Sequence, residues 1–421
     1  MKIAVVGGGS TYTPELVDGV ARLTGALKVT ELVLADPDEG RLAVVGPVSA
    51  RIMGRYGHPA RVRWTTSLDE AVDGAGAVLL QLRVGGQAAR QRDETWPLEC
   101  GCIGQETTGA GGLAKALRTV PIVLDIAERT QRRADPGAWI IDFTNPVGIV
   151  TRALLDAGHR AVGLCNVAIG FQRLFAGLLG VDPGQVSLDH VGLNHLTWER
   201  GAWVDGTDRL PALIAAHGSE IAGHTGLAPG VMHDLGAVPS YYLRYFYAHD
   251  AVVAEERGQP TRAQEVAAIE RELLAMYADP ALDRKPELLS QRGGAYYSEA
   301  AVALLASLVS DAGDTQVVNL RNGGTLDFLP DDAVIEVPAV IGADGPRPVP
   351  AAPLPPLMRG LVAHVSAYEE LAVDAALRGG RDRVRAALLA HPLVGQLDLA
   401  DGLADRLIAE NRRYLPWASG E

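Results

Sequence analysis

Cysteine is scarce in this chain. Only 3 of the 421 residues are cysteines, and two of them, Cys100 and Cys102, are separated by a single residue. Three cysteines do not make a disulfide framework, and this pair lacks the two-residue gap common in zinc ligand pairs. We therefore interpret Cys100 and Cys102 as structural and expect a reducing compartment, the cytoplasm.

Basic residues are also in short supply. The chain has 38 Lys and Arg against 51 Asp and Glu, which gives a formal net charge of −13. A nucleic-acid-binding protein needs a concentrated basic surface, so we expect no nucleic-acid partner. Any anionic ligand has to be attracted by a local cluster of arginines, against the field of the whole protein.

Long hydrophobic runs are absent. No window reaches the roughly 18 uninterrupted apolar residues of a membrane span, so we expect no membrane partner. The strand-like run at residues 1–6 is too short for the apolar region of a signal peptide. What is present is the composition of a globular protein, with 48% hydrophobic and 21% charged residues. The length allows two or three domains, or one large α/β unit with a second lobe.

Short β-branched runs alternate with amphipathic helical stretches over the first 170 residues. This rhythm predicts a parallel sheet covered by helices on both faces. Helices are expected to begin near Pro14 and Ala114. The predicted strands are Ile3–Val6, Glu31–Ala35, Val62–Thr65, Ala77–Leu82, Trp139–Phe143 and Ala161–Leu164.

The pattern changes in the second part of the chain, where strands and helices no longer alternate regularly. We therefore predict an α/β protein with an N-terminal Rossmann-like domain over residues 1–170 and a C-terminal α+β lobe over residues 171–421. The elements expected in this lobe are strands in Val186–Glu199 and Val317–Val340, helices in Leu210–Ala216 and Arg262–Tyr277, a Pro-rich connector at Pro346–Pro356, and a helical region from Leu357 to Tyr414.

A glycine-rich turn, Gly7-Gly8-Gly9-Ser10-Thr11, follows the first predicted strand and precedes a helix. Such a turn lets backbone N–H groups approach a pyrophosphate at a helix N-terminus. Asp36, at the end of the second predicted strand, is placed to accept hydrogen bonds from a ribose 2′-hydroxyl and to repel the extra phosphate of NADP. A plain turn and a solvated aspartate are the structural alternatives. We predict an NAD site formed by Gly7, Gly9, Ser10, Thr11 and Asp36.

Two further polar residues follow predicted strands at the same edge of the sheet, where ligands of open α/β sheets gather. They are Asn145, which precedes a proline, and Cys165. His195 closes the run Gly192-Leu193-Asn194-His195, and His190 would lie on the opposite face of the same predicted strand.

A thiolate and an imidazole together suit a borderline divalent metal, and two protein ligands leave positions open for substrate and water. Spacing does not show that Cys165 and His195 meet. A lone cysteine after a strand is usually a small buried hydrophobe, and a lone histidine is usually a structural residue, so these alternatives stay open for Cys165 and His195.

Motifs are spread over nearly the whole chain. They are the segments Gly7–Leu16, Gly104–Gly109, Phe143–Pro146, Gly163–Val167, Gly192–His195, Tyr242–Tyr245, Thr261–Ala263 and Asn319–Asn322. In this order they resemble the motifs of glycoside hydrolase family 4, and the subgroup most like this chain is that of the 6-phospho-β-glucosidases. The resemblance implies dependence on NAD and on a divalent metal, usually manganese, and the family departs from the two-carboxylate scheme of most glycosidases.

The resemblance assigns catalytic roles residue by residue. Cys165 and His195 would be the metal ligands, and Tyr242, next to Tyr241, would be the base. Asn166 follows the metal-binding cysteine, where α-specific relatives carry an aspartate that acts as general acid. With an asparagine at this position, the chain is similar to the β-specific relatives.

The resemblance also implies substrate contacts. Arg90 and Arg262 are similar to the family's phosphate-binding arginines, and Asn145 stands where relatives contact the sugar. For Glu106, we expect a supporting role in the site. It could orient a metal-bound water, hydrogen-bond a sugar hydroxyl, or cap the helix that follows.

The reaction implied by the resemblance is the hydrolysis of a phosphorylated disaccharide or aryl glycoside. It begins with hydride transfer from C3 to NAD⁺, continues with loss of the C2 proton and elimination of the aglycone, and ends with return of the hydride. A homodimer or homotetramer is expected. The alternative is an NAD-dependent hydroxy-acid or sugar dehydrogenase with net redox turnover, which would use a histidine base and no thiolate metal site.

Overall fold

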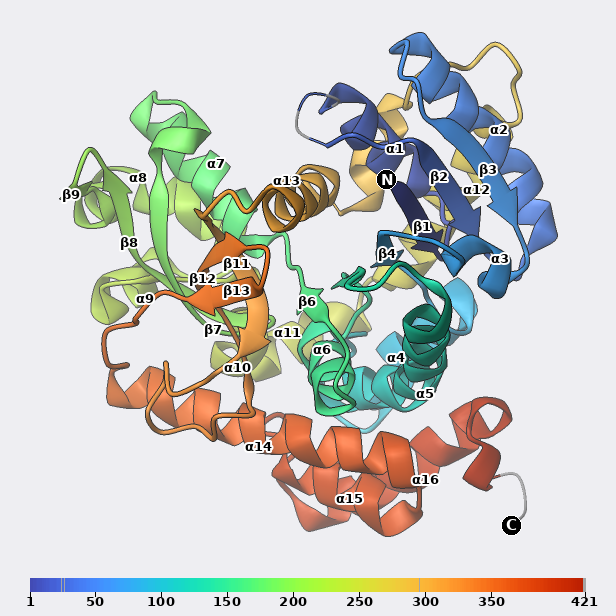
Figure 1. Ribbon diagram of the computed structural model, residues 1–421. Helices are drawn as coiled ribbons and strands as arrows, with labels where there is room; N and C mark the ends of the chain where they lie inside the picture. Colours follow the sequence, from blue (N-terminus) through green and yellow to red (C-terminus); the bar gives the residue numbers. More distant parts are fainter. Residues whose placement is uncertain (24, 26, 295, 419–421) are drawn as a thin grey trace.

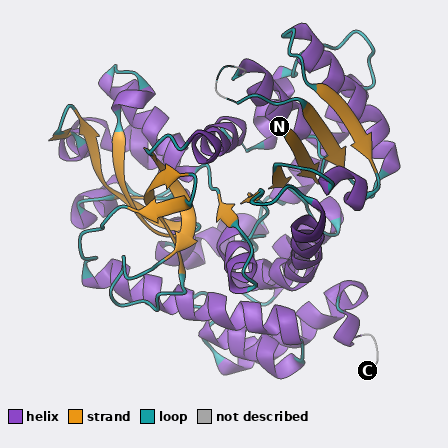
Figure 2. Ribbon diagram, in the orientation of Figure 1, coloured by secondary structure: helices purple, strands orange, loops and turns teal. Residues whose placement is uncertain are grey.

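The structure, a computed structural model, describes residues 1–23, 25, 27–294 and 296–418. Within these residues all thirteen strands belong to one sheet, in the order β10-β8-β7-β12-β11-β6-β5-β4-β1-β2-β3, with β13 beside β12 and β9 beside β8. Figure 1 shows the first strands on one side of the molecule and the later ones on the other, with β6 between them. Figure 2 shows helices on both faces of the sheet.

The first half of the sheet is parallel, in the order β3-β2-β1-β4-β5-β6. This is the strand order of dinucleotide-binding α/β sheets. The predicted strands are confirmed, although β4, β5 and β6 each end one or two residues earlier than predicted. The strands are β1 (Lys2–Val6), β2 (Glu31–Ala35), β3 (Arg61–Thr65), β4 (Ala77–Leu80), β5 (Trp139–Asp142) and β6 (Ala161–Gly163).

Helices connect these strands. The helix expected near Pro14 begins at Thr13, and the one expected near Ala114 begins earlier, at Gly109. The helices of this half are α1 (Thr13–Arg22), α2 (Glu39–Arg55), α3 (Leu68–Val72), α4 (Gly86–Glu99), α5 (Gly109–Arg133), α6 (Val147–Asp156) and α7 (Val167–Leu179).

The second half of the sheet is antiparallel. It joins the first half through β11 and β6, where Asn319 is paired with Gly163. The strands are β7 (Ser187–Leu193), β8 (Leu196–Val204), β9 (Thr207–Asp208), β10 (Val238–Pro239), β11 (Asp314–Arg321), β12 (Val334–Gly342) and β13 (Gly345–Pro348), the last of which begins just before the predicted Pro-rich connector.

The segment predicted as strands over Val186–Glu199 is a hairpin. Leu193 pairs with Leu196, so Asn194 and His195 form its two-residue turn, and His195 has φ of 62°. The prediction that His190 and His195 lie on opposite faces of one strand is therefore wrong, because His195 is outside the strand.

Helices of the second half return to the first half. α12 packs against α2 and α4, α13 against α1, and α14 against α5 and α6. In Figure 1, α14, α15 and α16 run along one side of the molecule. The helices are α8 (Leu210–Thr225), α9 (Pro229–Leu235), α10 (Arg244–Tyr247), α11 (His249–Arg257), α12 (Arg262–Tyr277), α13 (Tyr297–Ser310), α14 (Pro356–Arg378), α15 (Arg381–Ala390) and α16 (Leu397–Asn411), with short 3₁₀ turns η1 (Pro183–Gln185), η2 (Tyr241–Leu243), η3 (Glu287–Arg292), η4 (Arg412–Tyr414) and η5 (Pro416–Ala418).

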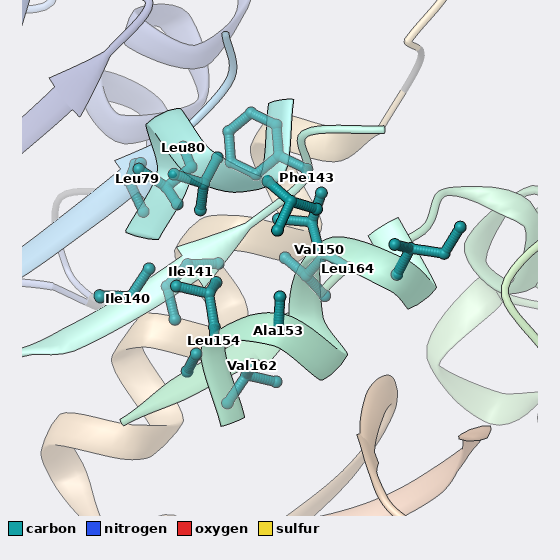
Figure 3. Close-up of a cluster of buried hydrophobic side chains, with 14 of the residues drawn as sticks. Leu79, Leu80, Ile140, Ile141, Phe143, Val150, Ala153, Leu154, Val162 and Leu164 are labelled. Carbon is teal, nitrogen blue, oxygen red and sulfur yellow. The ribbon is translucent and has the colours of Figure 1, made fainter. Parts of the chain in front are cut away.

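Apolar packing holds strands β4, β5 and β6 in place. Figure 3 shows the side chains of β4, β5 and β6 interleaved with those of α6, and all of them are buried in one hydrophobic cluster. Burial of each leucine- or isoleucine-sized side chain contributes about 1.5–3 kcal/mol. The carboxyl ends of these strands are thus fixed relative to one another. No helix among the residues described here is long and apolar enough to cross a bilayer.

Candidate active site

A cleft of about 1250 Å³ lies at the carboxyl ends of the parallel strands. Its walls combine residues from both halves of the chain, so the site exists only in the folded protein. Nine of the predicted site residues line it: Gly7, Ser10, Asp36, Arg90, Glu106, Asn145, Asn166, Tyr242 and Arg262. The other four, Gly9, Thr11, Cys165 and His195, are buried outside its lining.

The glycine-rich turn at one end of the cleft is too tight for side chains. Gly7 has φ of +86°, and a Cβ there would lie 2.8 Å from the carbonyl oxygen of Gln81. A Cβ on Gly8 would lie 2.8 Å from Cα of Leu34. Since α1 begins a few residues later, at Thr13, the turn presents backbone to the cleft at a helix N-terminus. This is the local structure that a pyrophosphate requires.

Asp36 lies directly after β2 and lines the same end of the cleft. Its Oδ2 accepts a hydrogen bond from the backbone N–H of Gly9 at 3.1 Å, and its Oδ1 accepts one from Asp38 at 3.0 Å. Burial raises the pKa of this carboxyl, although the two N–H donors oppose the shift. The carboxylate is therefore held at the edge of the glycine turn, at the position predicted for a ribose contact.

A partly buried arginine that the sequence did not single out reaches this turn from far along the chain. Arg292 Nε donates to Oγ1 of Thr11 at 2.7 Å, and its Nη2 donates to Oγ of Ser10 at 3.3 Å. Glu270 of α12 pairs with Arg292 at 3.2 Å and accepts from Thr11 at 3.1 Å. The turn thus has a positively charged group beside it. No local pattern marked Arg292, because the turn residues that it contacts, Ser10 and Thr11, are more than 280 residues away.

Cys165 and His195 both lie beside Tyr242, whose side chain lines the cleft. The ring of His195 stacks on that of Tyr242, with centroids 3.6 Å apart and planes 9° apart. The Cys165 thiol is close enough to raise the pKa of Tyr242, and the side chains of Asn194 and Tyr297 lower the pKa of that thiol. Within the described ranges, no cluster of three or more His, Cys, Asp and Glu side chains is arranged to hold a metal.

Burial sets the protonation of this cluster. It lowers the pKa of His195 to about 4, so the imidazole is neutral at pH 7, which is the form that binds metals. Burial also raises the pKa of the Cys165 thiol, and Glu336 adds to that shift. The pKa of Tyr242 is raised by burial, by Cys165 and by Glu106. A cation between these groups would favour both the thiolate and the phenolate.

A buried polar network that sequence reasoning missed supports the thiol. Glu336 of β12 accepts from Nδ2 of Asn194 at 3.0 Å and lies 3.0 Å from Nε2 of His190. Glu199 lies 2.6 Å from the other nitrogen of His190. Burial alone would lower the pKa of His190, but the two carboxylates raise it to about 10. The ring is therefore a cation, and its charge offsets that of Glu336 behind Cys165.

Glu106 is buried among three cations rather than placed at the helix end. It pairs with Arg83, with Arg90 at 3.2 Å and with Lys115 at 2.7 Å. Burial alone would raise its pKa, but these cations hold it well below the usual range. The pKa of Lys115 is lowered to about 7 by burial and by Arg83. The N-cap of α5 is Thr108 and not Glu106. Glu106 contacts α5 through Lys115 instead.

The predicted substrate residues differ in how many of their polar groups are already bound to other residues. Arg90 is held between Glu106 and Glu94, whose carboxylate lies 2.6 Å from its Nε. Arg262 is the first residue of α12; it is half-exposed, bound to Glu265 at 2.8 Å and to the carbonyl of Gln291 at 2.7 Å. Oδ1 of Asn145 is buried at the cleft and, within the part of the chain that is described, has no hydrogen-bond partner.

Comparison with known proteins reveals relatives along the whole chain. A model of the family 4 glycosyl hydrolases matches residues 2–181, and a model of that family's C-terminal domain matches residues 190–394. A probable 6-phospho-β-glucosidase of Bacillus subtilis is 38% identical over 432 residues, covering 99% of this chain and 97% of the relative. The 6-phospho-β-glucosidase of Escherichia coli is 35% identical, covering 99% and 96% respectively.

Solved structures agree with these matches. The 6-phospho-β-glucosidase of Thermotoga maritima, solved with manganese, NAD⁺ and glucose-6-phosphate, superposes with a TM-score of 0.91 and 32% identity, covering 98% of this chain and 99% of that one. The fold is thus Rossmann-like α/β, as predicted, and the protein is a glycosidase. The chain belongs to family 4 of the glycosyl hydrolases.

Proposed function

We propose that this chain hydrolyses 6-phospho-β-glucosides, both phosphorylated disaccharides and aryl glycosides, with NAD and Mn²⁺ as cofactors. The observation that carries the proposal is that Cys165 and His195 lie beside Tyr242, in the wall of a cleft that a dinucleotide-type turn also lines. The names of the relatives support the substrate class, and the ligands of the Thermotoga maritima structure support both cofactors.

The residues present fit both groups. The Gly7–Gly9 turn has no room for side chains, and Asp36 lies beside it. For the metal, a thiol and a neutral imidazole form a soft donor pair that suits a borderline cation. The unpartnered Oδ1 of Asn145 adds a buried acceptor toward the substrate. When bound, oxidised nicotinamide accepts a hydride and a divalent cation stabilises negative charge on neighbouring sugar oxygens.

Tyr242 acts as the base in this account. A ketone at C3 acidifies the proton on C2, and the Tyr242 phenolate removes it, after which the aglycone leaves from C1. Water then adds to C1 as C2 regains a proton, and the hydride returns to C3, so that no net oxidation occurs. Burial keeps the phenol protonated on its own, so Tyr242 depends on the charge held by Cys165 and His195 to become a base. This dependence explains why the base, Tyr242, lies beside the two proposed metal ligands.

Other side chains bind the sugar. Arg262, at the open wall of the cleft, and Arg90, deeper inside, provide positive charge for the 6-phosphate. Asn145 hydrogen-bonds a sugar hydroxyl. Glu106 keeps Arg90 in place. Asn166 lacks the acidic proton that an aspartate would offer, which supports a preference for β-glycosides.

The proposed function is tested with chromogenic substrates. We expect purified protein to release p-nitrophenol from p-nitrophenyl 6-phospho-β-glucoside only when NAD and Mn²⁺ are both present. The α-anomer and the unphosphorylated β-glucoside serve as matched controls and should be poor substrates. Steady accumulation of NADH during turnover would instead indicate the dehydrogenase alternative, and faster release from the α-anomer would contradict the predicted specificity.

Several properties stay predictions. A cytoplasmic location is supported by the three free thiols, Cys100, Cys102 and Cys165. Assembly into a homodimer or homotetramer has the family resemblance as its support. We also propose a division into residues 1–170 and 171–421, two parts that share one hydrophobic core.

A further inference from the structure

A short segment before α5 determines how hydrogen bonds run near His195. The side chain of Gln105 turns back on its own segment, where Oε1 accepts from the backbone N–H groups of Thr107 and of Thr108, the latter at 3.2 Å. Both of these groups are donors and nothing else. The Gln105 atom that faces them is therefore its carbonyl oxygen and not its NH₂ group.

The Thr107 hydroxyl bridges Gln105 and His195. Its Oγ1 lies 2.8 Å from Oε1 of Gln105 and 2.9 Å from Nδ1 of His195. A hydroxyl has one hydrogen to donate, and the Gln105 oxygen has none. The Thr107 hydrogen therefore points to Gln105, and toward His195 the same oxygen is an acceptor. A neutral imidazole has a single ring proton, so that proton is on Nδ1.

We infer that Thr107, with its hydroxyl directed by Gln105, holds His195 in the tautomer that leaves the Nε2 lone pair free for the metal. This inference rests on the proposal that His195 is a metal ligand. The stacked ring of Tyr242 fixes the plane of the imidazole but permits rotation within it. The bond from Nδ1 to Thr107 fixes that rotation, so together the two contacts orient Nε2. Thr107 is a positioning residue in this account.

The structural role is tested by two variants that differ in the hydroxyl. Thr107→Val keeps the shape of the side chain and removes the hydroxyl, whereas Thr107→Ser keeps the hydroxyl and removes the methyl group. Loss of such a supporting bond typically weakens metal affinity by about 10–100-fold. We expect that loss of Mn²⁺ affinity in Thr107→Val, near-complete recovery in Thr107→Ser, and equal NAD affinity in both, measured by titration calorimetry without substrate.

The tautomer itself is measured on the metal-free wild-type protein with ¹⁵N-labelled histidine. Two-bond ¹H–¹⁵N correlation spectra show which ring nitrogen is protonated, and the His195 signals are those lost in His195→Gln. In the wild type we expect the ring proton of His195 on Nδ1. In Thr107→Val we expect it on Nε2, or a mixture of the two tautomers. A wild-type proton on Nε2, or unchanged Mn²⁺ affinity in Thr107→Val, would overturn the inference. If wild-type protein bound no Mn²⁺, the metal proposal would fail, while the spectra would still decide the tautomer.

Discussion

Replacement of Tyr242 by Phe lowers kcat for a 6-phospho-β-glucoside by about 10²–10⁴-fold, the range that a general base contributes. Phenylalanine keeps the ring that stacks on His195, 3.6 Å away, and removes only the hydroxyl. The affinity for NAD should not change, because Tyr242 is not one of the residues predicted to bind it. Steady-state kinetics and a binding titration with NAD measure the two effects.

The neighbouring tyrosine provides a matched control. Tyr241 also lines the cleft, but its side chain is exposed and its hydroxyl accepts a hydrogen bond from Arg244 at 2.7 Å. Tyr241→Phe should therefore have kcat near that of the wild type. If Tyr241→Phe lost activity and Tyr242→Phe kept it, the base would be the tyrosine one position earlier.

Replacement of Cys165 by Ser weakens Mn²⁺ binding by more than the roughly 10–100-fold typical of residues that only support a ligand. Serine has nearly the same size, but its hydroxyl ionises far less readily than a thiol, so it is a poor ligand for a borderline metal. Calorimetric titration with Mn²⁺ measures the affinity, and activity should fall in parallel at low Mn²⁺ concentrations.

Cys100→Ser is the control for this substitution. Cys100 is a free, partly exposed thiol just after α4, outside the cleft lining. The Cys100→Ser variant should bind Mn²⁺ and NAD like the wild type. A Cys165→Ser variant that melted at the wild-type temperature and still bound Mn²⁺ at full strength would remove the thiol from the metal site.

The parallel half of the fold could be predicted from the sequence because its signal is local. Buried strands such as Ile3–Val6 and Leu32–Ala35 are continuous apolar runs, and the glycines after the first strand mark its turn into a helix. The structure ends β4, β5 and β6 earlier than predicted, because apolar residues such as Phe143 and Leu164 continue into the loops. Both of these side chains are buried in the hydrophobic core, although their residues lie outside the strands.

The hairpin at His195 had no comparable signal. Its two-residue turn is Asn194-His195, which lacks the glycine of the Asn-Gly and Asp-Gly pairs that mark such turns in a sequence. A positive φ is uncommon for a residue with a side chain, and histidine is among the few types enriched there. Only the pairing of Leu193 with Leu196 shows that the chain reverses at this point.

The site was predicted in part, and the missing part is long-range. Cys165, Asn145 and Asp36 follow strands, so their position at the sheet edge could be read from the sequence. Arg292 meets Ser10, and Thr107 meets His195, only because elements distant in the sequence pack together. No periodicity or spacing encodes such contacts.

The central claim, removal of a proton from C2, is tested most directly by isotope exchange. Wild-type protein with NAD and Mn²⁺ is allowed to hydrolyse a 6-phospho-β-glucoside in D₂O, and the glucose-6-phosphate product is analysed by NMR and mass spectrometry. We expect deuterium at C2 of the product. A product with hydrogen fully retained at C2 would contradict the proposed removal of the C2 proton.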